Sequence, residues 1–339
     1  MTSHPIDSQA CAGLVVVVTG GTAGIGRATA EAFARRGARV AVLARGMQRL
    51  DATARAIEQL GGQALAIAAD VADAQQVEAA AAQVEQHWGA IDIWVNNAMA
   101  TIFSAADRIS VEDFRRATDV TYHGAVWGTM AALRRMKPRG RGIVVQVGSA
   151  LAYRSIPLQA PYCAAKAALR GFTDSLRSEL IDEGSGVRLT MVQLSAFNTP
   201  QFDWGRTTMP RQPQPVPPIF QPELAGEAIV HAALHDRREW WVGWPAAKAI
   251  LAQRLAPGLL DRLLALMATK GQQSDEPLPE QRPDNLHQPA PGAQGAHGRF
   301  DALARERSLQ WWLATRRWVV AAAGVVLLGG VGVVLALAG

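Results

Sequence analysis

The sequence has few cysteines, few lysines and only one long hydrophobic run. Two cysteines among 339 residues, Cys11 and Cys163, are too few for a disulfide framework or a cysteine-rich metal site, so we expect a reducing compartment. The net charge is only +5, from 34 basic and 29 acidic residues, which gives no reason to expect a nucleic-acid partner. Hydrophobic residues make up 49% and charged residues 19%, which excludes disorder for most of the chain.

The hydrophobic run lies at the C-terminus. The segment from Val319 to Ala338 contains no charged or strongly polar side chain, and a helix of this length, at about 1.5 Å per residue, spans the roughly 30 Å hydrocarbon core of a bilayer. Tryptophans and the pair Arg316–Arg317 precede it, as at many membrane interfaces. The alternative is a buried C-terminal core helix. We predict a single-pass transmembrane helix over residues 318–338, with the preceding chain on the cytoplasmic side.

Short β-branched runs alternate with longer alanine-rich stretches through most of the chain. The predicted strands are Leu14–Thr19, Arg39–Ala44, Ala64–Ala69, Ile91–Val95, Gly142–Val147, Val187–Leu194 and Glu239–Val242. Nearly continuous apolar strands between amphipathic helices indicate a parallel sheet covered on both faces. We therefore predict an α/β fold of the doubly wound, Rossmann type with about seven strands, which binds ligands at the carboxyl ends of the strands.

Composition divides the chain into six parts. They are a tail (1–11), a catalytic Rossmann domain (12–245), an amphipathic helical extension (246–270), a proline-rich linker (271–299), a basic and aromatic juxtamembrane segment (300–317) and the transmembrane helix (318–338). The juxtamembrane segment is either an interfacial helix that leads into the span or a solvated stretch.

A glycine-rich turn follows the first predicted strand. Its predicted ligand-binding residues are Gly20, Thr22, Gly24, Ile25 and Gly26. Glycines let the backbone turn sharply and approach a pyrophosphate, and the N-terminus of the following helix offers unpaired N–H groups and a positive dipole end. The alternative is a purely structural turn. Because the motif lies between a strand and a helix, we favour dinucleotide binding.

Arg45 ends the second predicted strand. In dinucleotide-binding folds an acidic residue there accepts hydrogen bonds from the adenosine ribose, whereas an arginine can pair with a 2′-phosphate. The alternative is a solvated arginine at a strand end. Arg45 therefore favours NADP over NAD as the cofactor.

Ser149, Tyr162 and Lys166 form the predicted catalytic group. Tyr162 and Lys166 lie four residues apart, on one face of a predicted helix. A tyrosine has an ordinary pKa near 10, and we expect the lysine ammonium to lower it toward the working range, so that the hydroxyl can exchange a proton with a substrate oxygen. Ser149 lies just past the fifth predicted strand and can hydrogen-bond the same oxygen.

These motifs, in this order, resemble the short-chain dehydrogenase/reductase family over about residues 12–245. The resemblance implies that Tyr162 exchanges the proton, that Lys166 also holds the nicotinamide ribose and that Ser149 steadies the substrate. It also assigns the residues that surround the cofactor. They are Asp70 and Val71 after the third strand, Asn97 and Ala98 after the fourth, and Thr199 after the sixth.

Three positions depart from the family pattern. Thr121 stands where the family has an asparagine of the proton relay, Met99 replaces a glycine, and Leu194–Ser195 replaces Pro-Gly. The departures keep open an alternative function, a membrane-tethered nucleotide-binding scaffold with a degenerate active site.

We predict an NADP-dependent oxidoreductase that transfers hydride between nicotinamide and a carbonyl or secondary alcohol. The tether and nearby apolar residues indicate an apolar small-molecule substrate. No metal is expected, because His231 and His235 share a helical face without a carboxylate ligand. The family resemblance implies a homo-oligomer.

Overall fold

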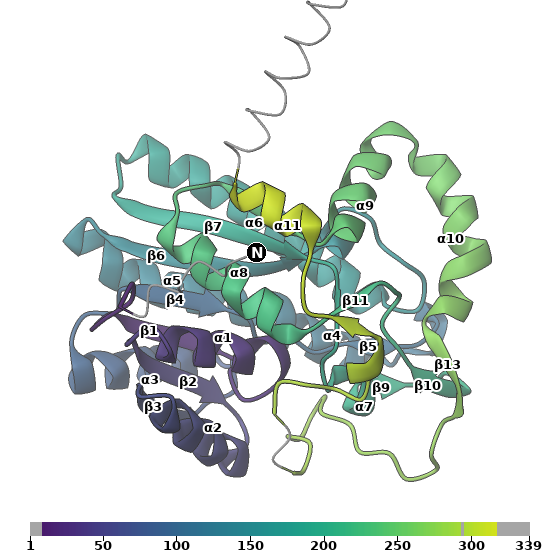
Figure 1. Cartoon of the computed structure of the whole chain (residues 1–339), viewed down its shortest axis with the longest axis horizontal. Helices are drawn as coiled ribbons and strands as arrows, with labels where there is room; N and C mark the ends of the chain where they lie inside the picture. Colours follow the sequence, from purple (N-terminus) through teal and green to yellow (C-terminus); the bar gives the residue numbers. More distant parts are fainter. Residues whose placement is uncertain (1–8, 293–294, 317–339) are drawn as a thin grey trace, which may run out of the picture.

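The computed structural model describes residues 9–292 and 295–316, and a seven-stranded sheet forms its centre (Figure 1). The strands are β1 (Val15–Thr19), β2 (Arg39–Ala44), β3 (Gln63–Ala68), β4 (Ile93–Asn96), β6 (Gly142–Ser149), β7 (Val187–Leu194) and β12 (Glu239–Val242). They lie in the order β12-β7-β6-β4-β1-β2-β3, and each neighbouring pair is parallel. The predicted doubly wound sheet is confirmed. The strand order reverses at β1, beside β4, and ligands bind such sheets at this switch point.

Helices cover both faces of the sheet. One layer contains α1 (Gly24–Ala34), α2 (Met47–Gln59) and α8 (Pro222–Leu234), and the other contains α3 (Ala74–Trp88), α4 (Val111–Thr118), α5 (Gly124–Met136) and α6 (Ala160–Asp182). Side chains of β1 alternate between them: Val16 and Val18 belong to the first core cluster, Val15 and Val17 to the second. Both faces are therefore apolar, which explains the continuous valine run.

Short elements surround the carboxyl edge of the sheet. They are β5 (Ile102–Phe103), β8 (Ala196–Phe197), α7 (Gln201–Trp204), β9 (Arg206–Thr207), β10 (Arg211–Pro213) and β11 (Ile219–Phe220). The chain continues through α9 (Trp244–Leu255), α10 (Pro257–Gly271), β13 (Gln273–Pro277), β14 (Ala304–Arg305) and α11 (Leu309–Thr315). The predicted helical extension thus consists of two helices, which are separated just before Pro257.

The segment predicted as a linker is packed against the domain, so the prediction of a spacer is wrong there. β13 pairs with β10, and Leu286 is fully buried in a core cluster. The segment after it is packed too, because Phe300 is buried, β14 pairs with β11, and Trp311 packs against the first core cluster. Residues 300–316 therefore attach to the domain through these contacts and do not form one interfacial helix, while most of residues 301–307 are exposed to solvent.

The predicted transmembrane helix lies outside the described residues. Within the described parts of the chain, no helix combines the length and the apolar character that a membrane crossing needs.

Candidate active site

The glycine-rich turn between β1 and α1 has room only for glycine at key positions. Gly20 and Gly24 have φ angles of +64° and +54°, a region that side chains disfavour. A Cβ at Gly26 would collide with the carbonyl oxygen of Gly20 and the side-chain amide of Asn97. That amide donates to the carbonyls of Thr19 at 3.0 Å and Gly20 at 3.2 Å. The turn is thus a tight cradle of the kind that a pyrophosphate fits.

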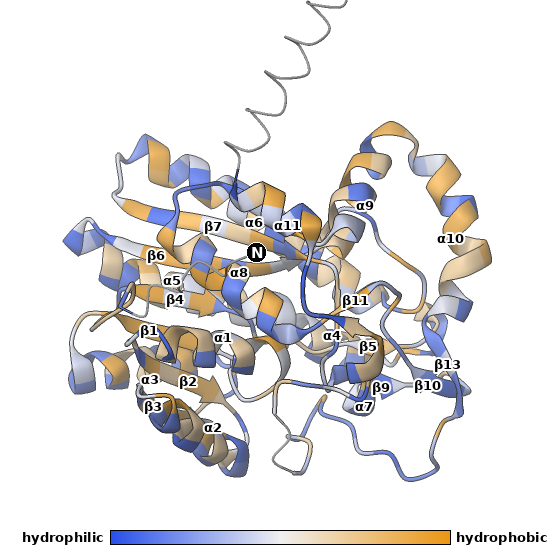
Figure 2. Ribbon diagram, viewed as in Figure 1, coloured by the Kyte–Doolittle hydropathy of each residue, from blue (hydrophilic) through white to orange (hydrophobic). Residues whose placement is uncertain are grey.

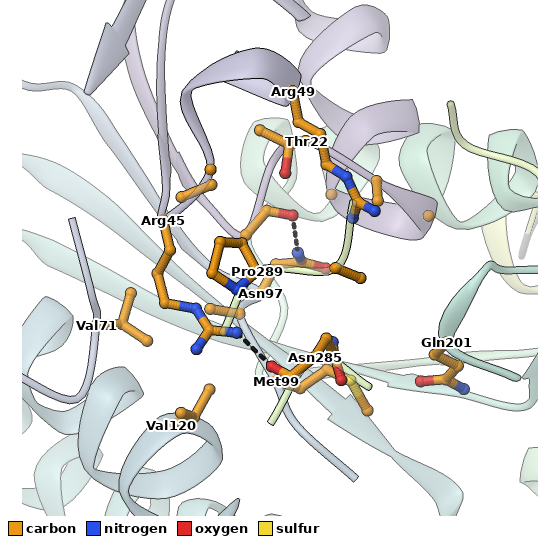
Figure 3. A pocket seen from close by; sticks show the side chains of 18 of the residues that line it. Thr22, Arg45, Arg49, Val71, Asn97, Met99, Val120, Gln201, Asn285 and Pro289 are labelled. Carbon is orange, nitrogen blue, oxygen red and sulfur yellow. Dashed lines mark hydrogen bonds between the residues drawn. The ribbon is translucent and has the colours of Figure 1, made fainter. Parts of the chain in front are cut away.

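The predicted cofactor residues of the turn and the strand ends line one cavity of about 190 Å³ (Figure 3). These residues are Gly20, Thr22, Gly24, Ile25, Gly26, Arg45, Asp70, Val71, Asn97, Ala98 and Thr199. They come from the carboxyl ends of β1 to β4 and from the chain after β8. The cavity therefore lies at the switch point of the sheet, at the carboxyl ends of the strands as predicted, and its donor set fits a dinucleotide.

None of the three predicted catalytic residues lines this cavity itself, but the order of the strands places Ser149 next to it. Ser149 is the last residue of β6, and β6 lies between β4 and β7 in the sheet. The chain after β4 supplies Met99 to the cavity, and the chain after β7 supplies Thr199. The end of β6 therefore lies between two walls of the cavity.

Tyr162 and Lys166 both lie in the first turns of α6. The ammonium Nζ of Lys166 lies 5.7 Å from the centre of the Tyr162 ring, so the two side chains share one face of the helix. Lys166 is only 2% exposed, and its Nζ donates to the carbonyl oxygen of Val147 on β6 at 2.6 Å. This bond fixes the lysine against the strand that ends in Ser149.

Burial controls the protonation of both groups. It raises the pKa of Tyr162 to about 12, against a smaller opposite effect of a hydrogen bond with Ser149, and it lowers the pKa of Lys166 to about 8. The predicted lowering of the tyrosine pKa by the ammonium is therefore wrong for this structure. Desolvation is the largest influence on this pKa, and Tyr162 is neutral at neutral pH.

The family model for short chain dehydrogenases matches residues 14–208. The chain belongs to this family. Uncharacterized oxidoreductase YxnA of Bacillus subtilis is 32% identical over 314 residues, which cover 92% of this chain and 87% of that protein. The 3β-hydroxysteroid dehydrogenase 1 of Eggerthella lenta is 35% identical over 190 residues, or 56% of this chain and 72% of that protein.

A solved structure of the family has the same architecture. The alcohol dehydrogenase of the archaeon Thermococcus sibiricus, complexed with 5-hydroxy-NADP, is similar with a TM-score of 0.59 and 27% sequence identity. The similarity covers 68% of this chain and 95% of that structure. Together with the relatives, it shows that the chain is an oxidoreductase of the short-chain dehydrogenase family.

Thr121, which replaces the relay asparagine of the family, lies in a π-helical turn (Asp119–His123) between α4 and α5. Its Oγ1 accepts from the N–H of Ala100 at 2.9 Å and donates to the Ala100 carbonyl at 3.0 Å. A hydroxyl carries a single hydrogen, and here that hydrogen is already in a bond. Thr121 therefore joins the π turn, a feature frequent at functional sites, to the loop that supplies Met99.

Arg45 is not solvated. Its guanidinium donates to backbone carbonyls of the C-terminal extension: His287 at 2.9 Å, Leu286 at 3.2 Å and Asn285 (Figure 3). Burial, with a smaller contribution from Arg116, lowers the pKa of Arg45. The predicted phosphate-binding residue thus holds a segment of the extension. We call residues 282–292 the strap.

The strap and Arg49 are parts of the site that sequence reasoning missed. Arg49 is 8% exposed, lies 4.2 Å from the Trp204 ring centre, and donates to the carbonyls of Pro291 at 2.8 Å and Gly292 at 2.7 Å. Beyond the strap, the Gly295 carbonyl accepts from the N–H of Gly24 at 3.3 Å. Because the strap contributes mainly backbone acceptors, its side chains carry no recognisable signal.

His231, His235 and Cys163, the weaker candidates for functional residues, are packed against other side chains or buried. His231 and His235 stack at 3.8 Å between ring centres, and His231 packs against Trp240 and Trp311. Cys163 is 2% exposed, and burial raises its pKa, so it lacks the features of a reactive thiol. Among residues 9–292 and 295–316, no cluster of three potential metal ligands occurs.

Proposed function

We propose that the protein is an NADP-dependent, membrane-tethered oxidoreductase that interconverts an apolar carbonyl compound and its secondary alcohol. The observation that carries this proposal is that Ser149 ends β6, between the two strands whose following loops line the cofactor cavity, with Tyr162 and Lys166 together on α6. A bound nicotinamide cofactor supplies or accepts the hydride.

The three side chains supply the proton chemistry. In reduction, the neutral Tyr162 hydroxyl donates its proton to the substrate oxygen as the hydride reaches the carbon, so the C=O bond becomes CH–OH. Ser149, whose hydrogen bond with Tyr162 opposes the rise in its pKa, orients that oxygen. Lys166 places a positive charge beside the phenol, which favours the phenolate left after transfer. The reverse sequence oxidises the alcohol.

Three arginines support NADP as the cofactor. Arg45 and Arg49 line the cavity. Arg116, which pairs with Asp70 at 2.5 Å, also lies close enough to contribute to the lowered pKa of Arg45. A 2′-phosphate dianion would offset this repulsion and accept charge-assisted hydrogen bonds. The Thermococcus sibiricus enzyme carries an NADP derivative, in agreement with this proposal.

Apolar side chains near the site support an apolar substrate. Met99 and Trp204 line the cavity, and Phe202 packs in a buried cluster with Phe103 and Phe300. The Eggerthella lenta relative is named for a hydroxysteroid. The scaffold alternative rests on the departures at Thr121, Met99 and Leu194. Of these, Thr121 forms two hydrogen bonds with the backbone of Ala100 that keep the π turn in place.

The tether is the apolar segment of residues 318–338, with the catalytic domain on the cytoplasmic side. Its length and composition support a membrane span. Carbonate extraction of membranes tests it. The anchored protein stays in the pellet, and release into the supernatant would contradict the tether.

A substrate screen tests the activity. Purified full-length protein is offered apolar and small polar ketones, aldehydes and secondary alcohols, with NADP(H) and NAD(H) side by side. We expect turnover with NADP(H) and the higher kcat/KM with apolar compounds. A preference for NAD(H), or for polar compounds, would contradict the corresponding part of the proposal.

A further inference from the structure

The hairpin formed by α9 and α10 exposes an apolar face. Leu255, Leu266 and Met267 are 85%, 75% and 68% exposed. The face also includes Trp244, Leu251, Leu259 and Leu263. Figure 2 shows these helices standing out from the domain with hydrophobic residues along them. Because burying such side chains is favourable, an exposed patch of this kind indicates an interaction surface.

The charges on the hairpin are almost all positive. Its basic residues are Lys248, Arg254, Arg262 and Lys270, all exposed. Its one acidic residue, Asp261, forms an ion pair at 2.7 Å with Arg154 of the domain. An apolar helical face bordered by unpaired lysines and arginines is typical of surfaces that bind anionic lipid.

The hairpin lies against the loop that joins the catalytic residues. α9 contacts residues Ala150–Ala152, which directly follow Ser149. Arg154 of this loop donates to Gln253 of α9 at 3.0 Å. At the other end of the loop, Gln159 donates to Gln272, directly after α10, at 2.7 Å. A surface that bound the hairpin would therefore lie next to the catalytic trio.

We propose that the α9–α10 hairpin docks on an anionic lipid surface and that the enzyme takes its apolar substrate from that membrane. The docking part stands on the hairpin itself, and the substrate part rests on the proposed function. The chain outside the structure agrees with this occupant. It follows α11, which contacts α9, and its sequence becomes uniformly apolar at Val319.

Two other occupants fit the observations less well. The C-terminal segment could fold back onto the hairpin, but it is apolar around its whole circumference, so its remaining sides would still face water. A second copy of the hairpin would bring two basic faces together. A lipid surface covers the hairpin and the segment at the same time, and its anionic headgroups match the charge.

Depth-dependent fluorescence quenching tests the docking with the full-length protein. Leu266→Cys is labelled with an environment-sensitive fluorophore; both native cysteines are buried. The matched control is Ile181→Cys, because Ile181 is 73% exposed but lies at the far end of α6, toward the amino edge of the sheet. Both proteins are reconstituted into vesicles of phosphatidylcholine and phosphatidylglycerol that contain nitroxide-labelled lipid.

We expect the label at position 266 to shift to the blue and lose emission by quenching, and the label at position 181 to do neither. Replacing phosphatidylglycerol by phosphatidylcholine should reduce the quenching at position 266, although the tether still holds the protein. A blue-shifted label that lipid does not quench would show that the C-terminal segment or a second copy covers the hairpin. Any of three results would overturn the docking proposal. They are this blue shift without quenching, the unquenched emission of a solvent-exposed label at position 266, and equal quenching at positions 266 and 181.

NADPH turnover in the Ile181→Cys sample separates this proposal from the proposed function. Quenching without turnover on any screened compound would leave the docking and contradict the function. Turnover without quenching would contradict the docking alone.

Discussion

Tyr162 and Lys166 respond to burial in opposite directions. The phenol keeps its proton because its pKa is about 12, so it can act as the acid. The ammonium has a pKa of about 8, so it is the group of the pair that titrates near physiological pH. The lysine should therefore set the pH dependence.

We expect kcat/KM for carbonyl reduction to fall as the pH rises through about 8, because Lys166 then loses the charge that stabilises the phenolate. Lys166→Arg should move this limb to higher pH, since a guanidinium stays charged. The pH profiles of both proteins, with Tyr162→Phe as the inactive control, check this expectation. A wild-type profile that stays flat from pH 7 to pH 10 would contradict it.

Arg45 should discriminate between the two cofactors. Replacing it by leucine removes charge-assisted hydrogen bonds, each worth roughly 1.5–3 kcal/mol, so the Kd for NADPH should rise about 10- to 150-fold while the Kd for NADH changes little. Titration calorimetry of Arg45→Leu measures both. Arg55→Ala, at an exposed position of α2, is the control. Equal losses for NADPH and NADH would show that Arg45 does not contact the 2′-phosphate.

The sequence predicts where the site residues lie better than it predicts their pKa values and hydrogen-bond partners. The spacing of Tyr162 and Lys166 follows from helical geometry, so their shared face could be predicted. The pKa of Tyr162 could not, because it depends on how much protein surrounds the ring. The partners of Arg45 could not either, because they are backbone carbonyls of a segment about 240 residues away.

At the scale of elements, the strap is the main departure from the predicted organisation. Apolar continuity defined the seven strands to within two residues, because the central strands are buried on both faces and the edge strands β3 and β12 are half-buried. A polar, proline-rich stretch carries no such periodicity and was interpreted as a linker. Its position is fixed by arginines of the domain and by one fully buried side chain, Leu286.

The strap should control how fast the cofactor enters and leaves. The cavity of about 190 Å³ is smaller than the roughly 300–1,000 Å³ of typical ligand pockets, so a dinucleotide requires the strap to move. Leu286→Ala removes about 2–5 kcal/mol of packing and should raise both the association and dissociation rate constants for NADPH. Stopped-flow NADPH fluorescence measures them, with Leu303→Ala at an exposed site as control. Unchanged rate constants in Leu286→Ala would contradict this role.

The junction of α8 and α11 should weaken in acid. Burial, reinforced by His235, lowers the pKa of His231 to about 4, against about 6.5 for an unperturbed histidine. Between these values the unfolded chain binds more protons than the folded one, so stability is lost as the pH falls from about 6.5 toward 4. The loss of Tm between pH 7 and pH 5 should be smaller for His231→Gln than for the wild type or the exposed control His87→Gln. An identical loss in all three would contradict this account.

At the scale of the whole molecule, one catalytic domain carries an extension that closes over the cofactor site and supports the catalytic loop. The match to YxnA covers 92% of the chain, more than residues 1–245 alone make up, so it includes part of the extension. The membrane span and the homo-oligomer remain predictions. Both depend on features outside the described residues or on the family resemblance.

The central claim is that Tyr162 donates the proton in an NADP-dependent carbonyl reduction. The most direct test compares wild type and Tyr162→Phe with NADPH and the best carbonyl compound from the screen, after NADPH binding has been shown to be equal. Because general acid catalysis contributes typically 10²–10⁴-fold, we expect kcat to fall by at least about 100-fold in the variant. Turnover by Tyr162→Phe at the wild-type rate would contradict the account.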